Sequence, residues 1–149
     1  MIERHGGRVP ETVEELRTLP GIGRYTAGAI SSIAFGRREP VLDGNVERVL
    51  CRAFLIRTNP KSAPTQARLR RLAESLLPLH GAGDMNQALM ELGATICAPR
   101  RPRCEVCPIR RRCRAFARGE QEHLPLKVRR ARTRSEEHTS ELQSQNAIS

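Results

Sequence analysis

Four of the chain's five cysteines lie close together in the sequence, with the spacing C-x6-C-x2-C-x5-C. These four residues are Cys97, Cys104, Cys107 and Cys113. Clustered thiolates are typical ligands of zinc or of an iron–sulfur cluster. Zinc sites more often show two C-x2-C pairs separated by a longer stretch, and only one such pair occurs here. The spacing therefore favours an iron–sulfur cluster and leaves zinc open as the alternative.

Positive charge is concentrated around and after these cysteines. The chain of 149 residues has a formal net charge of +10. Residues 98–134 hold 13 Arg or Lys against three Glu, which accounts for the whole excess. A block of this kind is typical of a surface that faces nucleic-acid phosphates, or of a solvated tail.

The rest of the composition narrows the class of protein. No apolar run approaches the length of a membrane helix, and no signal peptide opens the chain, so we expect no membrane partner and a cytosolic location. Thiols stay reduced in that compartment, which favours metal binding over disulfides. With no Trp, one Tyr and three Phe, stacking on many bases is not expected to dominate binding.

The apolar pattern is helical along most of the chain and shows no strand, so the sequence predicts an all-α fold. A capping box runs from Thr12 to Glu15, and Asp43 is a plausible N-cap for a later helix. The other predicted helices cover residues 24–35, 64–77 and 84–97.

A sharp break, Leu-Pro-Gly-Ile-Gly, separates two of these predicted helices at residues 19–23. Two glycines allow a tight turn and a close approach to a partner, and the next helix begins with free N–H groups. Such a hairpin can seat a DNA phosphate without reading the base, although an ordinary turn between helices is the alternative. The residues expected at this contact are Leu19, Gly21, Ile22, Gly23 and Arg24.

Three motifs in this order resemble the helix-hairpin-helix DNA glycosylases related to endonuclease III, and most of all their adenine glycosylase branch. They are LPGIGRYTAG (19–28), VLDGNVERVL (41–50) and NQALMELGATIC (86–97), and the resemblance covers roughly residues 1–130. It implies a partial helix-hairpin-helix glycosylase fold with a C-terminal iron–sulfur loop. It also implies hydrolysis of adenine from DNA where adenine is mispaired with 8-oxoguanine or guanine, leaving an abasic site.

The resemblance assigns catalytic roles to Asp43, Tyr25 and Asn45. Breaking an N-glycosidic bond leaves positive charge on the sugar, which a carboxylate such as that of Asp43 would stabilise. Tyr25 stands where lyase relatives carry a Schiff-base lysine, so a monofunctional enzyme is expected. Asn45 resembles a residue of that family that makes a hydrogen bond near the sugar or the catalytic water. The alternatives are a helix cap for Asp43, a packing tyrosine and a local helix-start role for Asn45.

The cysteine spacing is also the signature of that family, which implies one 4Fe–4S cluster held by all four thiolates. Because hydrolysis at Asp43 needs no electron, we expect the cluster to shape a loop that presents arginines to DNA. Those arginines include Arg100, Arg101 and Arg103. Cys51, in the middle of a predicted helix, is expected to be a core thiol.

The resemblance further implies that the chain is truncated at both ends. The general-acid glutamate would lie upstream of Met1, so we expect little activity from this polypeptide alone. The expected divisions are a partial barrel with the hairpin and Asp43 (1–63), a helical cluster domain (64–118), a basic linker (119–133) and a foreign tail (134–149). That tail resembles a translated sequencing adapter, and we exclude it from the fold.

Two other functions fit the same residues. One is an endonuclease III-like glycosylase with lyase activity, against which Tyr25 argues. The other is a non-catalytic DNA-binding module with a metal-stabilised loop. In the favoured interpretation the partner is double-stranded DNA containing an adenine mispair, bound by a monomer associated with the nucleoid of a bacterial cytoplasm.

Overall fold

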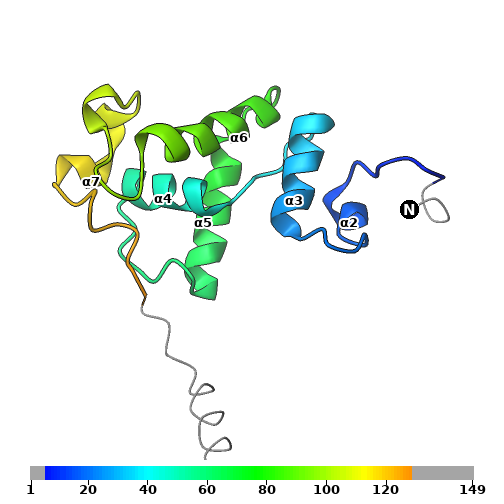
Figure 1. Ribbon diagram of the computed structural model, residues 1–149, viewed down its shortest axis with the longest axis horizontal. Coiled ribbons are helices and arrows are strands. Elements are labelled where there is room, and N and C mark those ends of the chain that lie inside the picture. The colour runs from blue at the N-terminus through cyan, green and yellow to red at the C-terminus, as the bar shows by residue number, and fades with distance from the viewer. Residues whose placement is uncertain (1–5, 129–149) are drawn as a thin grey trace, which may run out of the picture.

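The computed structural model describes residues 6–128, so the expected tail at 134–149 lies outside the described residues. Within them every regular element is a helix or helical turn, which confirms the all-α prediction. Figure 1 shows α2 and α3 at one end, α4, α5 and α6 in the middle, and α7 at the opposite end. The elements are α2 (Val13–Leu16), α3 (Arg24–Ala29), η1 (Ile30–Ala34), α4 (Gly44–Ala53), α5 (Ala63–Leu76), α6 (Ala82–Glu91), η2 (Leu92–Ile96), η3 (Cys104–Val106), η4 (Arg110–Arg112) and α7 (Arg114–Ala117).

The predicted capping box begins α2. The Thr12 hydroxyl accepts a hydrogen bond from the Glu15 backbone N–H at 3.3 Å and donates to the Glu15 carboxylate at 2.9 Å. The first half of the motif therefore forms as expected, since a side-chain oxygen satisfies a backbone donor of the first turn. The Glu15 side chain bonds the Thr12 hydroxyl, whereas a standard box would bond the Thr12 N–H.

The helix predicted over residues 24–35 consists of α3 and the π-helical turn η1, and it ends one residue early at Ala34. The buried Ser32 donates from its hydroxyl to the Gly28 carbonyl at 2.8 Å, so its polar group is satisfied within the helix. Gly36, at a φ of 66°, then reverses the chain, which is a conformation that suits glycine.

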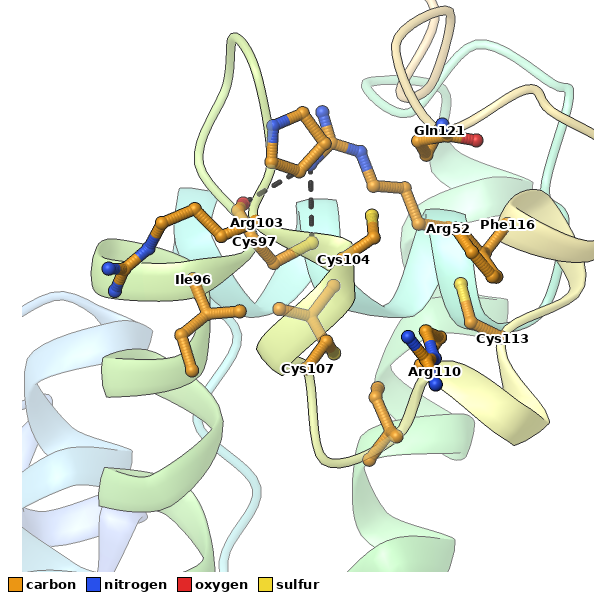
Figure 2. A pocket seen from close by; sticks show the side chains of 13 residues that line it. Arg52, Ile96, Cys97, Arg103, Cys104, Cys107, Arg110, Cys113, Phe116 and Gln121 are labelled. Atoms are coloured by element: carbon orange, nitrogen blue, oxygen red, sulfur yellow. Dashed lines mark hydrogen bonds between the residues drawn. The ribbon is translucent and has the colours of Figure 1, made fainter.

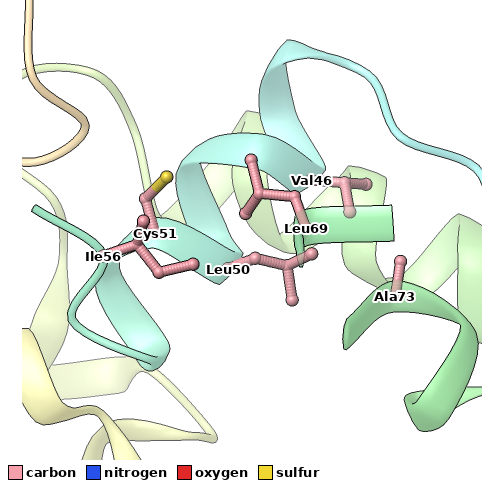
Figure 3. Packing of buried hydrophobic residues seen from close by; sticks show 6 residues of the cluster. All are labelled: Val46, Leu50, Cys51, Ile56, Leu69 and Ala73. Carbon is pink, nitrogen blue, oxygen red and sulfur yellow. The ribbon is translucent and has the colours of Figure 1, made fainter. Parts of the chain in front are cut away.

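The apolar core lies where α4 packs against α5. Val46, Leu50 and Cys51 of α4 meet Leu69 and Ala73 of α5, and Figure 3 shows this packing. Cys51 is fully buried, which confirms its expected place in the core. Burial raises the pKa of its thiol to about 11, so the group stays protonated near neutral pH.

The last two predicted helices form with shifted ends. The stretch 64–77 is observed as α5, which begins and ends one residue earlier. The stretch 84–97 is observed as α6 and the π-helical turn η2, running from Ala82 to Ile96. Beyond η2 the chain folds into the short turns η3 and η4 and the one-turn helix α7, which packs against α4.

Close backbone contacts bring α6 and η2 against the elements before them. A Cβ added to Gly83 would lie 2.5 Å from the Ser32 carbonyl oxygen, so only glycine fits there without a shift. The buried Asn86 accepts from the Val41 N–H at 3.2 Å and donates to the Glu39 carbonyl at 2.8 Å. These contacts fix the extended link that leads into α4.

No helix among residues 6–128 is long and apolar enough to cross a membrane.

Candidate functional site

Asp43 caps the N-terminus of α4, directly after the fixed extended link. Its Oδ1 accepts a hydrogen bond from the Val46 N–H at 2.7 Å, and its Oδ2 accepts from the Asn45 Nδ2 at 3.2 Å. The prediction of an N-cap is therefore confirmed. The half-buried carboxylate is held in one orientation by these two donors.

Asn45 connects this carboxylate to an arginine one turn along α4. Its Oδ1 accepts a hydrogen bond from Nη2 of Arg48 at 2.8 Å, which also fixes which end of the amide faces Asp43. The same Nη2 donates to the Gly93 carbonyl, and Nε donates to the Cys97 carbonyl, both at 2.7 Å. Burial lowers the pKa of the Arg48 guanidinium. A continuous set of hydrogen bonds thus joins Asp43 to the first of the four cysteines.

Gly93 of η2 lies directly against Asn45. A Cβ at this glycine would fall 2.7 Å from the Asn45 Cβ and 2.8 Å from its carbonyl oxygen. Such distances leave no room for a side chain. The absence of a side chain at Gly93 therefore allows η2 to support the Asp43 end of α4.

The hairpin is open to solvent at its turn. Gly21 has a φ of 81°, and an added Cβ at Gly21 or Gly23 would meet no other atom within 4 Å. Gly23 is the N-cap residue of α3 and has no side chain. No capping side chain therefore bonds the first backbone N–H groups of the helix. Leu19 and Ile22 are half-buried beneath the turn, and Arg24 is exposed beside it.

Tyr25 lies in the first turn of α3 with 47% of its surface exposed. Its hydroxyl lies 3.8 Å from the sulfur of Met90 in α6, a weak contact across 65 residues of sequence. The side chain therefore reaches from the hairpin toward the helix that continues into η2.

All four clustered cysteines line one cavity, which Figure 2 shows from close by. Residues of α4, η2, η4 and α7 complete its walls, among them Val49, Ile96 and Phe116. Burial raises the pKa of the Cys104 and Cys107 thiols, and the neighbouring thiols raise the pKa of both further. The sequence grouping of these cysteines is thus a grouping in space as well.

Arg52 closes the cavity from α4. It is 2% exposed, and within residues 6–128 all the hydrogen bonds of its guanidinium go to the chain around the cavity. Nη1 donates to the Cys97 sulfur at 3.2 Å and Nε donates to the Leu124 carbonyl at 2.9 Å, and the other acceptors are backbone carbonyls of residues 97–99. Figure 2 shows Arg52 reaching across to Cys97.

The arginines that were expected to face DNA lie on the exposed side of the same loop. Arg100, Arg101 and Arg103 are all exposed. Arg103 donates from Nη2 to the Thr95 carbonyl at 3.2 Å, which holds its side chain beside η2. Arg101 adopts a positive φ of 49° at the tip of the loop.

Sequence reasoning missed the two arginines of α4. Arg48 and Arg52 read as ordinary basic positions of an amphipathic helix. Their spacing was nevertheless a signal, because residues four apart share one helical face with Asn45 one turn earlier. That face turned out to be covered by the cysteine loop.

Comparison with known proteins agrees with this arrangement. A model of the helix-hairpin-helix motif matches residues 4–33. The human adenine DNA glycosylase is 53% identical over 125 residues, which are 83% of this chain and 23% of that protein. The adenine DNA glycosylase of Arabidopsis thaliana is 45% identical over 131 residues, 84% of this chain and 21% of that one. That of Buchnera aphidicola from Acyrthosiphon pisum is 38% identical over 125 residues, 84% of this chain and 36% of that one.

Solved structures show the same fold. A thermostable thymine-DNA glycosylase superposes with a TM-score of 0.70 at 37% identity, over 78% of this chain and 54% of that one. A trapped covalent complex of endonuclease III with DNA gives 0.65 at 28% identity, over 79% and 54%. The chain spans about a fifth to a third of the length of the curated relatives given above. Over the part that is covered, the chain is similar to adenine DNA glycosylases, contains the helix-hairpin-helix motif and shares the fold of solved DNA glycosylases related to endonuclease III.

Proposed function

We propose that the chain forms part of a monofunctional DNA glycosylase that hydrolyses the N-glycosidic bond of adenine mispaired with 8-oxoguanine or guanine. The observation that carries the proposal is the Asp43 carboxylate, oriented by two hydrogen bonds at the end of a fixed link. The partner of the proposed glycosylase is double-stranded DNA containing such a mispair. The relatives named adenine DNA glycosylase support this choice of base.

Asp43 is the proposed catalytic residue. As the bond from the sugar to adenine breaks, positive charge develops at the sugar carbon, and the ionised carboxylate stabilises it. Adenine leaves with the bonding electron pair and takes up a proton, water adds to the sugar carbon and gives up a proton, and an abasic site remains. Because the carboxylate is already oriented by Val46 and Asn45, little reorganisation is needed during the reaction.

Asn45 and Tyr25 assist in this proposal. Asn45 donates to one carboxylate oxygen and is itself fixed by Arg48, so it sets the direction of the carboxylate. Tyr25 is a phenol in the first turn of the hairpin's second helix and cannot form a Schiff base with the sugar. This supports hydrolysis without strand cleavage.

DNA is bound through its phosphates at two places. The open turn at Gly21 and Gly23 allows a phosphate to approach the uncapped start of α3. Arg100, Arg101 and Arg103 offer a second, positively charged contact on the cysteine loop. Both contacts position the duplex and do not read its sequence.

The cysteine cavity fits a 4Fe–4S cluster better than a single zinc ion. Four thiols around one zinc lie about 2.3 Å from the same ion and therefore close to one another. Among the described residues no three His, Cys, Asp or Glu side chains converge closely enough to hold one ion, although all four thiols line one cavity. Thiolates that bind separate irons of a cluster stand further apart. Cys97, Cys104, Cys107 and Cys113 would hold it.

When bound, such a cluster supplies a rigid multi-point attachment and a redox-active centre. The protein's own residues do the rest. Arg52 holds the first cysteine and the chain after it, and Arg48 connects that cysteine's carbonyl to the Asp43 end of α4.

The test is a single-turnover excision assay on a duplex with adenine opposite 8-oxoguanine. We would use a chimera in which this chain replaces the matching segment of the human relative. Asp43→Asn should lower the rate at least about a hundredfold. The matched control is Asp84→Asn, an exposed acid in the first turn of α6, which should leave the rate unchanged.

Retained excision in the Asp43→Asn chimera would overturn the catalytic role of Asp43. Borohydride trapping of a covalent complex between protein and DNA would instead establish the glycosylase and lyase alternative. Binding of the duplex without excision by the parent chimera would support a DNA-binding module.

A further inference from the structure

One buried polar atom stands out near the cysteine cavity. Among residues 6–128, the side-chain oxygen of Gln121 is the buried side-chain nitrogen or oxygen atom that has no hydrogen-bond partner. Leaving such an atom unpaired is costly because its hydration is lost without a replacement, so each case calls for an explanation. Gln121 lines the same cavity as the four cysteines. Figure 2 shows it at the edge of the cavity on the side of Phe116.

The segment that carries Gln121 is held in place on both sides. Just before it, Glu120 accepts a hydrogen bond from Nε of Arg57 at 2.8 Å, and the Glu120 N–H donates to the Ala115 carbonyl at 2.9 Å. Three residues after it, the Leu124 carbonyl accepts from Arg52. Gln121 is therefore a fixed part of the cavity wall.

The chemistry of the amide suggests its partner. The two ends of a glutamine amide have nearly the same shape, so a half-turn about the last bond exchanges the oxygen for two N–H donors. Sulfur atoms of thiolates and of a cluster are acceptors. A carbonyl oxygen beside them would be repelled, whereas an N–H group would be attracted.

We propose that Gln121 is a positioning residue of the cluster site, whose amide N–H donates a hydrogen bond to a sulfur of the bound group. The inference rests on the proposed 4Fe–4S cluster. It adds a donor on the α7 side of the cavity to the one that Arg52 supplies to Cys97 from α4. Hydrogen bonds to sulfur stabilise the more negative, reduced state and slow the loss of metal.

The experiment uses the full chain, reconstituted with iron and sulfide without oxygen. Gln121→Leu keeps the approximate size of the side chain and removes the donor, and Gln121→Glu keeps its shape and replaces the donor with a negative oxygen. Glu122→Leu, an exposed position in the same segment, is the matched control. Three quantities are measured: iron per chain, the rate of iron loss to a chelator, and the reduction potential.

We expect Gln121→Leu to lose iron about tenfold faster than the parent chain. Its reduction potential should move to more negative values, and Gln121→Glu should move it further in the same direction. Glu122→Leu should match the parent in both. If the Leu variant does not load, the Glu variant, which has the shape of the native residue, carries the comparison.

Two outcomes would overturn the inference, and they are distinguishable. A parent chain that binds no iron and sulfide would remove the proposed cluster and this inference with it. A parent chain that loads normally, with both Gln121 variants unchanged in potential and in iron loss, would overturn the role of Gln121 alone. A purely structural role could alter loading but would not shift the potential in the order Gln, Leu, Glu.

Discussion

Replacing Gly93 with alanine tests the contact that supports Asp43. The added Cβ would lie 2.7 Å from the Asn45 Cβ and 2.9 Å from its carbonyl carbon, whereas ordinary contacts begin at 3.4 Å. Either η2 or the start of α4 must therefore move by about 0.7 Å, because both sides of the contact include backbone atoms. Asn45 lies at the centre of that contact, so the strain falls where Asp43 is oriented.

The expected loss of stability can be estimated. Overpacking of this kind costs about 1–3 kcal/mol, and alanine regains up to about 1 kcal/mol over glycine within a helix. We expect a net loss of about 1–2 kcal/mol in the free energy of unfolding. With an m-value of about 1.5 kcal/mol/M in urea, the unfolding midpoint would fall by about 1 M.

Gly44→Ala is the matched control. Gly44 is the first residue of α4 and flanks Asn45 directly, and a Cβ there would meet no atom within 4 Å. It should raise the midpoint slightly, since alanine favours the helix. The assay is urea unfolding followed by far-ultraviolet circular dichroism, with all variants in the same metal state. Equal midpoints for Gly93→Ala and the parent chain would refute the described contact.

Three further predictions concern titration and charge. Because the pKa of Cys51 is about 11, an alkylating reagent at pH 8 should modify its thiol about a hundredfold more slowly than an ordinary thiol, as peptide mapping by mass spectrometry would show. Burial raises the pKa of Glu39, so its charged form disfavours the fold at neutral pH. Glu39→Gln should therefore raise the thermal midpoint at pH 7, and this advantage should shrink as the pH falls through the raised pKa and be absent below 4.5. Arg48→Met should break the contacts to Asn45 and Cys97 and slow excision in the chimera at least about tenfold. Arg68→Met, at an exposed position of α5, should leave the rate unchanged, and equal rates for the two variants would contradict the role given to Arg48.

Local features of the fold could be predicted from the sequence. The caps at Thr12 and Asp43 depend on side chains that bond backbone groups within three residues, so the pattern contains all the necessary information. The grouping of the cysteines was also predictable, because short spacing keeps them near one another. The roles of Asp43, Tyr25 and Asn45 in catalysis remain predictions.

Contacts across long stretches of sequence could not be predicted. Gly83 and Gly93 look like weak positions in helices until the backbone that lies against each is known. The π-helical turns η1 and η2 lie at these two contacts: Gly83 meets the backbone of η1, and Gly93 belongs to η2. The contacts of Arg52 and the place of Gln121 in the cavity wall exist only once the cysteine loop and the C-terminal segment have folded back over α4.

The partners of Arg52 also bear on the order in which the chain folds. Its bond to the Leu124 carbonyl joins residues 72 positions apart, whereas the α4 and α5 core is assembled from neighbouring helices. Long loops close late, because closing them costs conformational entropy of the chain before the distant contacts can compensate for that cost. We therefore expect refolding to form the α4 and α5 core first and to dock residues 97–124 last. During that interval the four thiols would stay accessible on an already collapsed chain, which is the window in which the iron and sulfide of the proposed cluster would be delivered.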